Sequence, residues 1–574
     1  MRDFKNFSSA ILIATLVSSS VLFFIGSESN LPFAVFLASL SFIVMFGFII
    51  FRFSKLSQFL SIFFIVVVPL TVSLAYELLS SYPLGQDVHA EHHVITSVTS
   101  NQNIQLGSAG EYSDAALFLL LYDMVEQITG LSLVGVIKYF TSFVIGLIPL
   151  FVYCYVSSYN QGRFPSFIAS IFILIQFSFV VTLHSTFKQG LALALLPLML
   201  LTLVNQEWCC RIENLVTYLL LTIGMTGFHY TTSAFVAFTL FSSVFANVLL
   251  YKPSAKRERS KIFGINKNIL ILFLPIVVWI GWYVIFSKNI VLSVVNILSN
   301  TLSFRRAGYY DYIALSSQST TANIIRIGIN YITVLVLIVG TYDLMEKEKT
   351  IRNHMSITII ASAVFLFVLN LGSEFLNLTT LGIGRTSLIF FIILTPVVYY
   401  GFRRLWLFVM KDSKTLFHLT ALTIVIVFAL RFSITLGSID YPNNMHSNEP
   451  FYDPNYRFVA SISESDIATA TFLNKYISNR IAVIGTDLRG INRLYYIPEL
   501  WSRTRIIYTY FFSFGFYESS IDLKADYIFL SSYNFKINEI NAALHVNDRL
   551  GKYLPSLFYN RNLVFNSRLT AIFN

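Results

Sequence analysis

The residues best suited to chemistry lie in one short segment, Gly85–His93, between apolar stretches. Its sequence, Gly-Gln-Asp-Val-His-Ala-Glu-His-His, gathers two carboxylates and three imidazoles. If the segment is helical, Asp87 and Glu91 share one face because they are four residues apart. Neighbouring carboxylates can supply a general base, and with an imidazole such as His89 they can hold a divalent cation such as Mg²⁺ or Mn²⁺. The competing interpretation is a solvated polar loop.

Further polar residues fall at the ends of other apolar stretches. They are His184, Lys188, His229, Tyr230, Glu374 and Arg385. Polar groups at membrane depth are costly and often mark a site or a pathway. Acids on one external loop and bases on others form the charge layout expected where an anionic lipid phosphate meets a catalytic carboxylate. The alternative is a purely interfacial role, in which Lys188 and Arg385 extend toward lipid headgroups.

Composition indicates what must position these residues. Hydrophobic residues make up 55% of the 574 residues, charged residues make up 12%, and the mean hydropathy is +0.66. A soluble globular protein carries about 25% charged residues, so lipid must be the solvent for most of this chain. Apolar stretches approach the roughly 20 residues that cross a bilayer as a helix. We predict about thirteen such helices, at 10–26, 33–51, 59–76, 133–156, 165–183, 189–204, 214–228, 232–250, 269–287, 323–343, 356–372, 386–402 and 416–435.

The distribution of charge predicts how these helices are oriented. The net charge of +10 comes largely from alternate loops such as Lys252–Lys267 and Arg403–Lys414, which argues for membrane topology and against nucleic-acid binding. These loops and the amino terminus should be cytoplasmic. The loop 77–132 contains acids and no Lys or Arg, so it should lie outside. Within it, Ala115–Ile128 should be an amphipathic helix along the membrane surface.

An odd number of spans places residues 437–574 on the extracytoplasmic side of the cell membrane. A helix is predicted at Ser463–Ile477. The predicted strands are Arg480–Thr486, Ile506–Tyr510, Ala525–Ser531 and a terminal pair within Asn562–Asn574. Helices that alternate with short buried strands are typical of a small α/β domain. The expected architecture is therefore mainly α, with a multi-pass transmembrane domain at 1–436 and a soluble α/β domain at 437–574.

Three short motifs resemble the GT-C superfamily of integral membrane glycosyltransferases, especially its prokaryotic and archaeal branches. The segment 87–92 (Asp-Val-His-Ala-Glu-His) is similar to an external Asp-Ile-His-x-Glu-Tyr motif. Phe187-Lys188-Gln189 stands where Arg-Gln is usual, and 228–233 (Phe-His-Tyr-Thr-Thr-Ser) is similar to Ser-His-Tyr-Ser-Thr-Ser. Two departures are His92 in place of an aromatic residue and Lys188 in place of arginine, which keeps the charge but loses bidentate phosphate binding.

The resemblance implies an inverting transfer of a sugar from a polyprenyl-phosphate-linked donor to a glycan or protein acceptor outside the cell. Asp87 would be the general base, and Glu91 with His89 would orient the acceptor or hold the cation. Lys188 and Arg385 would neutralise the lipid phosphate as it leaves. Four further residues at the predicted external ends of spans are candidates for substrate binding: His184, His229, Tyr230 and Glu374.

Three other functions fit part of the pattern. A transporter or flippase of lipid-linked glycans would also need polar residues at the outer boundary, although the sequence shows none of the internal repeats common in transporters. A polymerase or ligase of lipid-linked glycans would use similar substrates but rely more on external arginines. A structural or sensor protein would use its tail as the working part. All three stay open at this point.

Overall fold

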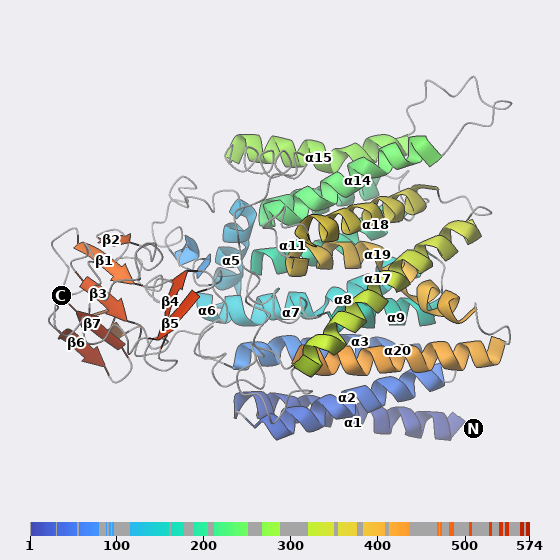
Figure 1. The fold of residues 1–574 in the computed structure, drawn as a ribbon, viewed down its shortest axis with the longest axis horizontal. Coiled ribbons are helices and arrows are strands. Elements are labelled where there is room, and N and C mark those ends of the chain that lie inside the picture. The colour runs from blue at the N-terminus through green and yellow to red at the C-terminus, as the bar shows by residue number, and fades with distance from the viewer. Residues whose placement is uncertain are drawn as a thin grey trace.

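The chain forms mainly helices that run side by side in one bundle, as the computed structural model shows (Figure 1). The structure describes residues 2–29, 31–53, 57–79, 88, 91–92, 94–96, 115–159, 162–176, 179, 183, 187–204, 212–250, 267–286, 320–348, 354–375, 383–407, 413–436, 466, 468–469, 471–472, 482–486, 504–507, 527–530, 539–543, 546–549, 563–567 and 570–573. The first helices are α1 (Arg2–Glu28), α2 (Pro32–Arg52), α3 (Gln58–Leu78), α5 (Ala116–Thr129), α6 (Leu133–Gly135), η3 (Val136–Phe140), α7 (Thr141–Gly146), α8 (Ile148–Ser157) and α9 (Arg163–Leu174). The later ones are α11 (Phe187–Val204), α13 (Ile212–Phe228), α14 (Tyr230–Leu250), α15 (Lys267–Phe286), α17 (Thr320–Glu348), α18 (His354–Phe375), α19 (Ile383–Leu407) and α20 (Ser413–Leu436).

Eight helices in the described part of the chain are long and apolar enough to cross a membrane. They cover Ala10–Glu28, Phe33–Arg52, Gln58–Leu78, Leu133–Ser157, Phe187–Val204, Gly328–Glu346, Ser387–Leu407 and Thr415–Ser433. The apolar stretches of α9, α13, α14, α15 and α18 are shorter. Each predicted span overlaps a described helix, and the eight long ones indicate a multi-pass membrane protein. The full count of about thirteen spans stays a prediction.

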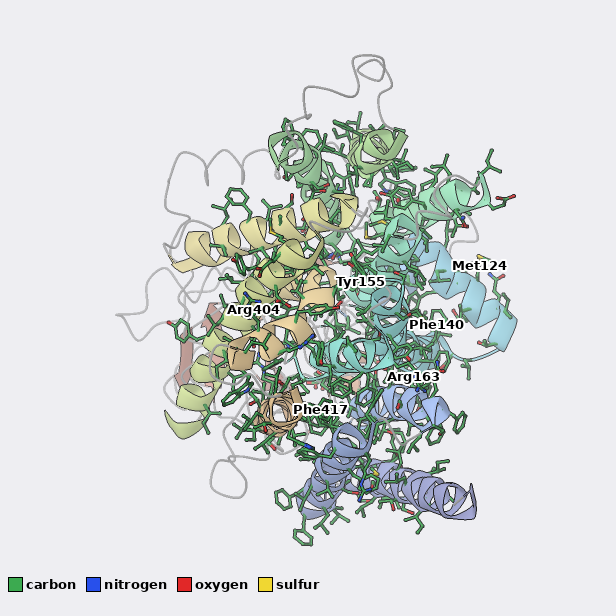
Figure 2. All side chains as sticks on the ribbon, turned by 90° about the vertical axis from the view of Figure 1, so that its right-hand side faces the viewer. Met124, Phe140, Tyr155, Arg163, Arg404 and Phe417 are labelled. Carbon is green, nitrogen blue, oxygen red and sulfur yellow. The ribbon has the colours of Figure 1, made fainter. Side chains whose placement is uncertain are left out.

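At the centre of the bundle, hydroxyl groups donate hydrogen bonds to backbone carbonyls of α19. Pro396 inside α19 has no N–H, so the carbonyl of Ile392 loses its helical donor. The Thr395 hydroxyl donates to that carbonyl at 2.8 Å, and the Tyr155 hydroxyl of α8 donates to the next carbonyl, Ile393 O, at 3.2 Å. Figure 2 shows Tyr155 deep among the helices. Satisfying these carbonyls matters because an unpaired one in hydrocarbon costs several kcal/mol.

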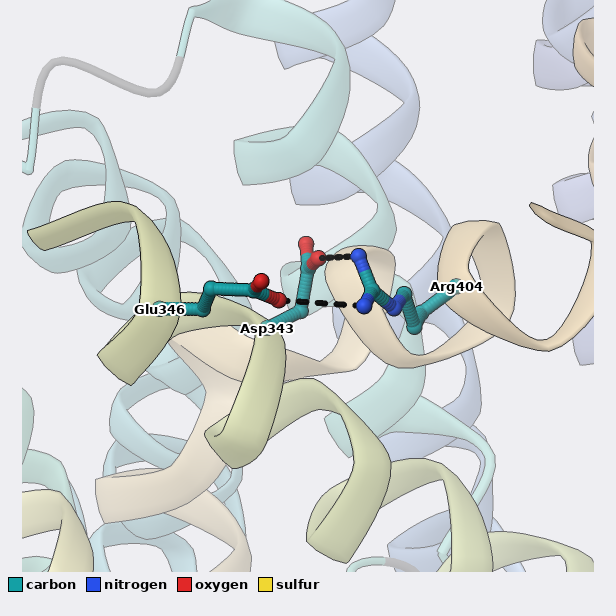
Figure 3. Close-up of polar contacts among 3 residues, drawn as sticks. All are labelled: Asp343, Glu346 and Arg404. Carbon is teal, nitrogen blue, oxygen red and sulfur yellow. Dashed lines mark hydrogen bonds and ion pairs between the residues drawn. The ribbon is translucent and has the colours of Figure 1, made fainter. Parts of the chain in front are cut away.

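Helices α17 and α19 pack against each other closely. A Cβ added to Gly401 would lie 2.0 Å from the Val336 carbonyl oxygen, so the two backbones touch. Beyond this contact, Arg404 bridges two acids of α17 (Figure 3). Its guanidinium lies 3.3 Å from Asp343 Oδ1 and 3.0 Å from Glu346 Oε2. The carboxyl end of α17 and the amino terminus of the chain lie at the same end of the bundle (Figure 1).

The helix predicted along the membrane surface, Ala115–Ile128, is present as α5. One face carries exposed Met124 and Ile128, and the other buries Phe118 and Tyr122. Figure 2 shows Met124 at the periphery of the molecule. The helix ends at Gly130, whose positive φ of 68° suits glycine. The amphipathic pattern therefore packs α5 against the bundle through one face only.

The carboxyl-terminal strands form two sheets. They are β1 (Ala482–Thr486), β2 (Thr504–Ile507), β3 (Tyr527–Leu530), β4 (Glu539–Ala543), β5 (Val546–Arg549), β6 (Leu563–Ser567) and β7 (Thr570–Phe573). Five have the order β2-β1-β3-β7-β6, with β1 parallel to β2 and β3, and β7 antiparallel to β3 and β6. These five overlap the predicted strands, whereas the hairpin β4-β5 was not predicted. The parallel pairs require crossover connections, but the helical layer of an α/β domain stays a prediction.

Figure 1 places the strands beyond the end of the bundle that carries α5 and α6, opposite the amino terminus. The described strands and the described residues between Val88 and Thr96 therefore lie at the same end of the molecule. Which side of the membrane this end faces stays a prediction.

Candidate functional site

The segment that follows α3 is seated on the end of the bundle. Val88 and Ile95 are fully buried, in one hydrophobic cluster with residues of α5, η3 and α11. The buried members of this cluster are Val88, Ile95, Ala115, Phe118, Leu119, Tyr122, Leu133, Val136, Ile137, Phe187 and Leu191. The described part of the segment is thus packed against the helices, unlike the solvated polar loop that was the alternative.

Two charged side chains are buried where α3 ends and the next span begins. Glu77 in the last turn of α3 is 0% exposed, and Lys138 in η3 is 5% exposed. Because α3 packs against η3, both charges lie in the same region between helices. One turn deeper, the Ser73 hydroxyl donates to the Ser142 carbonyl oxygen at 2.8 Å. Ser73 precedes Glu77 by four residues in α3, and Ser142 lies just after the turn that carries Lys138, so this hydrogen bond joins the two elements close to the charges.

Lys138 lies in a π-helical turn rather than an α-helical one. The turn Val136–Phe140 begins three residues after the start of the span Leu133–Ser157. A π-turn accommodates an extra residue, and such turns often occur at functional sites. Lys138 is the middle residue of this turn.

Tyr122 of α5 joins the same group. Its hydroxyl hydrogen-bonds the Thr141 hydroxyl. Burial raises the pKa of Tyr122 well above its ordinary value; the bond to Thr141 lowers it in part, and the charges of Glu91 and Glu77 raise it further. The phenol is therefore neutral at physiological pH. Glu91 itself is 0% exposed.

We call Glu77, Glu91, Tyr122, Lys138 and Thr141 the buried polar cluster. It combines groups from α3, the segment that follows it, α5, η3 and α7 at one end of the bundle: two acids, one ammonium and two hydroxyls. In the low dielectric of a buried site, charges act on one another more strongly than in water. The arrangement can orient a carboxylate and supply hydrogen bonds to a polar ligand.

His229 occupies the turn between α13 and α14. Its Nδ1 accepts the Thr232 backbone N–H at 3.2 Å and lies 2.8 Å from the Thr232 hydroxyl. The side chain thus satisfies one of the free N–H groups at the start of α14. Because Nδ1 accepts, the neutral ring carries its proton on Nε2. His229 is 8% exposed and so has a structural role that the sequence motif does not reveal.

The neighbouring helix α15 holds this turn in place. The Tyr283 hydroxyl donates to the Thr226 carbonyl oxygen at 2.6 Å, and Trp279 Nε1 donates to the Tyr230 carbonyl oxygen at 3.2 Å. The two acceptors lie on either side of His229. A turn fixed from both sides presents its side chains with little rotational freedom, as a preorganised site requires.

The three resembling motifs meet at this end of the bundle. Phe187, which precedes Lys188 at the start of α11, is buried in the hydrophobic cluster with Val88. Phe228, which precedes His229, packs against the same cluster. Lys188 is half-buried. Segments that are far apart in the sequence are therefore adjacent in space.

The structure describes the other predicted site residues only in part. Asp87, His89 and His184 lie outside the described residues. Glu374 lies in the last turn of α18 and Arg385 in the first turn of α19, but their side chains lie outside the described part. Tyr230 is half-buried and its ring centroid lies 5.5 Å from that of His229.

The site contains residues that sequence reasoning did not select. Lys138 was visible only as a lysine inside an apolar span, a costly placement that is itself a signal. Glu77 was one of several acids in the external loop. Nothing in the sequence pairs Tyr122 with Thr141, because that contact depends on how α5 packs.

Of the proposed cation ligands Asp87, His89 and Glu91, the first two lie outside the described residues. Among the residues that are described, no group of three His, Cys, Asp or Glu side chains could hold a metal ion. A Mg²⁺ or Mn²⁺ site therefore stays a prediction.

No family model matches the chain, and no curated protein is similar to it. The functional conclusion consequently depends on the chain's own residues.

Proposed function

We propose that this protein is a membrane glycosyltransferase that moves a sugar from a polyprenyl-phosphate-linked donor to a glycan or protein acceptor on the extracytoplasmic side. Asp87 acts as the general base, and Glu91 orients the segment that carries it. Lys188 and Arg385 neutralise the phosphate that leaves with the lipid. His89, His184, His229, Tyr230 and Glu374 bind the substrates.

The observation that carries this proposal is the convergence of the three motifs at one end of a membrane bundle. Val88 and Phe187 lie in one hydrophobic cluster and Phe228 packs against it, so the segments that carry Glu91, Lys188 and His229 all contact this cluster. A lipid-linked sugar phosphate needs a cation for its phosphate and a carboxylate for the acceptor proton. In this proposal Lys188 supplies the cation and Asp87 the carboxylate.

The purified protein should release polyprenyl phosphate from a radiolabelled polyprenyl-phospho-sugar and transfer the label to an acceptor, in assays with and without a chelator. Movement of intact lipid-linked sugar across a vesicle membrane, with no release of polyprenyl phosphate, would instead favour the transporter alternative. Chain growth on a lipid-linked glycan would favour the polymerase.

The proposed orientation gives a separate prediction. A single cysteine introduced at Asn103 or at Asn534 should react with a membrane-impermeant maleimide in intact cells, because both positions follow spans that end outside. A cysteine at Ser260 should react only after permeabilisation. Labelling of Ser260→Cys from outside would reverse the assignment of the active face.

Close packing between α13 and α5 predicts a sensitive position. A Cβ at Gly227 would lie 2.5 Å from Leu117 Cδ1 and 3.0 Å from Leu117 Cβ, so Gly227→Ala must displace α5. Overpacking of this kind costs about 1–3 kcal/mol, and we expect the transfer rate to fall roughly tenfold or more. Gly224→Ala is the matched control, because its Cβ would meet only the side-chain end of Leu195. Equal rates for the two variants would show that α5 does not position the site.

A further inference from the structure

The buried polar cluster contains a lysine to which the proposed mechanism gives no role. Lys138 lies in a π-turn near the amino-terminal end of its span, where it is almost completely buried. Glu77 is buried at the end of α3, which packs against η3 and is joined to the same span by the Ser73–Ser142 hydrogen bond. Burying an ammonium is costly unless an opposite charge compensates it, so the chain's retention of both groups requires an explanation.

The cluster connects Lys138 to the segment that carries the proposed base. Thr141 follows Lys138 by three residues and hydrogen-bonds Tyr122 of α5. The charges of Glu91 and Glu77 both raise the pKa of Tyr122. Tyr122 also packs in the same hydrophobic cluster as Val88. Asp87 is the residue next to Val88. A change of charge at Lys138 therefore affects the segment through the side chains of Thr141 and Tyr122.

We propose that Lys138 is a positioning residue for the transfer reaction. Its ammonium compensates the buried carboxylate Glu77, and the hydrogen bond of Thr141 with Tyr122 connects this part of the span to the cluster that holds Val88, the residue next to Asp87. This inference rests on the proposed glycosyltransferase function. It differs from the role of Lys188, because Lys138 acts through Glu77 and Tyr122 and not by binding the donor phosphate.

The test compares Lys138→Met, Lys138→Arg, Glu77→Gln, the double variant Glu77→Gln/Lys138→Met and the control Tyr139→Phe, all as full-length protein, in the polyprenyl-phospho-sugar assay. Lys138→Met keeps the length of the side chain and removes the charge. We expect kcat to fall about 10–100-fold while the KM for the donor changes less than about threefold, because removal of one partner leaves buried charge uncompensated. Lys138→Arg should recover most of kcat, since it restores the charge.

The double variant Glu77→Gln/Lys138→Met distinguishes charge compensation from packing. Its loss of kcat should be smaller than the product of the two single losses, because both charges are removed together. Tyr139→Phe is the matched control, since it lies in the same π-turn with an exposed side chain and should retain wild-type kcat.

Two results would overturn the inference while leaving the proposed function intact: normal kcat in Lys138→Met, or fully multiplicative losses in the double variant. A selective rise in donor KM would also overturn it and make Lys138 a phosphate ligand. Absence of transfer by the wild-type protein, in contrast, would contradict the proposed function itself.

Discussion

Replacement of Asp87 by asparagine is expected to lower the rate of sugar transfer by about 10²–10⁴-fold, the typical contribution of a general base. Asparagine keeps the size of the side chain and most of its hydrogen bonds, so the change tests the charge alone. The variant should insert into the membrane and bind the lipid-linked donor normally. The measurement is the release of polyprenyl phosphate by equal amounts of purified wild-type and variant protein.

Glu91→Gln serves as the comparison for this prediction. Glu91 is fully buried and its proposed role is to orient its segment, so its replacement should reduce transfer less than Asp87→Asn does. A near-normal turnover of Asp87→Asn would remove the case for this segment as the active site. The transporter alternative would then become the leading one.

The second large effect is expected at Lys188. If its ammonium neutralises the departing phosphate, Lys188→Ala should lower kcat/KM for the donor by about 10²–10³-fold, as removal of one group that stabilises developing charge typically does. Lys188→Arg should retain most activity, because the related motif has arginine at this position. Arg385→Ala should behave like Lys188→Ala if both residues contact the same phosphate.

Arg305→Ala is the control for these two cations, since Arg305 lies in a loop predicted to be external and has no assigned role. Small and equal losses at all three positions would indicate that Lys188 and Arg385 extend to lipid headgroups instead. Thermal unfolding of each variant in detergent separates a local loss of phosphate binding from a loss of the fold.

Hydropathy and charge together predict most of the secondary structure of this chain. A helix that crosses lipid must satisfy its backbone internally and expose apolar side chains along its whole length, so each span is encoded in about 20 neighbouring residues. For this reason every predicted span overlaps a helix, from α1 to α20. The strands β1, β2, β3, β6 and β7 were likewise predictable as short apolar runs between turn residues.

The composition of the site was decided only by the tertiary structure. The pairing of Glu77 with Lys138 requires two helix faces to meet at a particular rotation, and a π-turn sets that rotation in one of them. Hydropathy does not record rotation about a helix axis when both helices are apolar all round. Tyr122 reaches Thr141 because α5 packs against the bundle through one face. The sequence thus determined which helices and strands form. The packing of their faces determined which polar groups share a site.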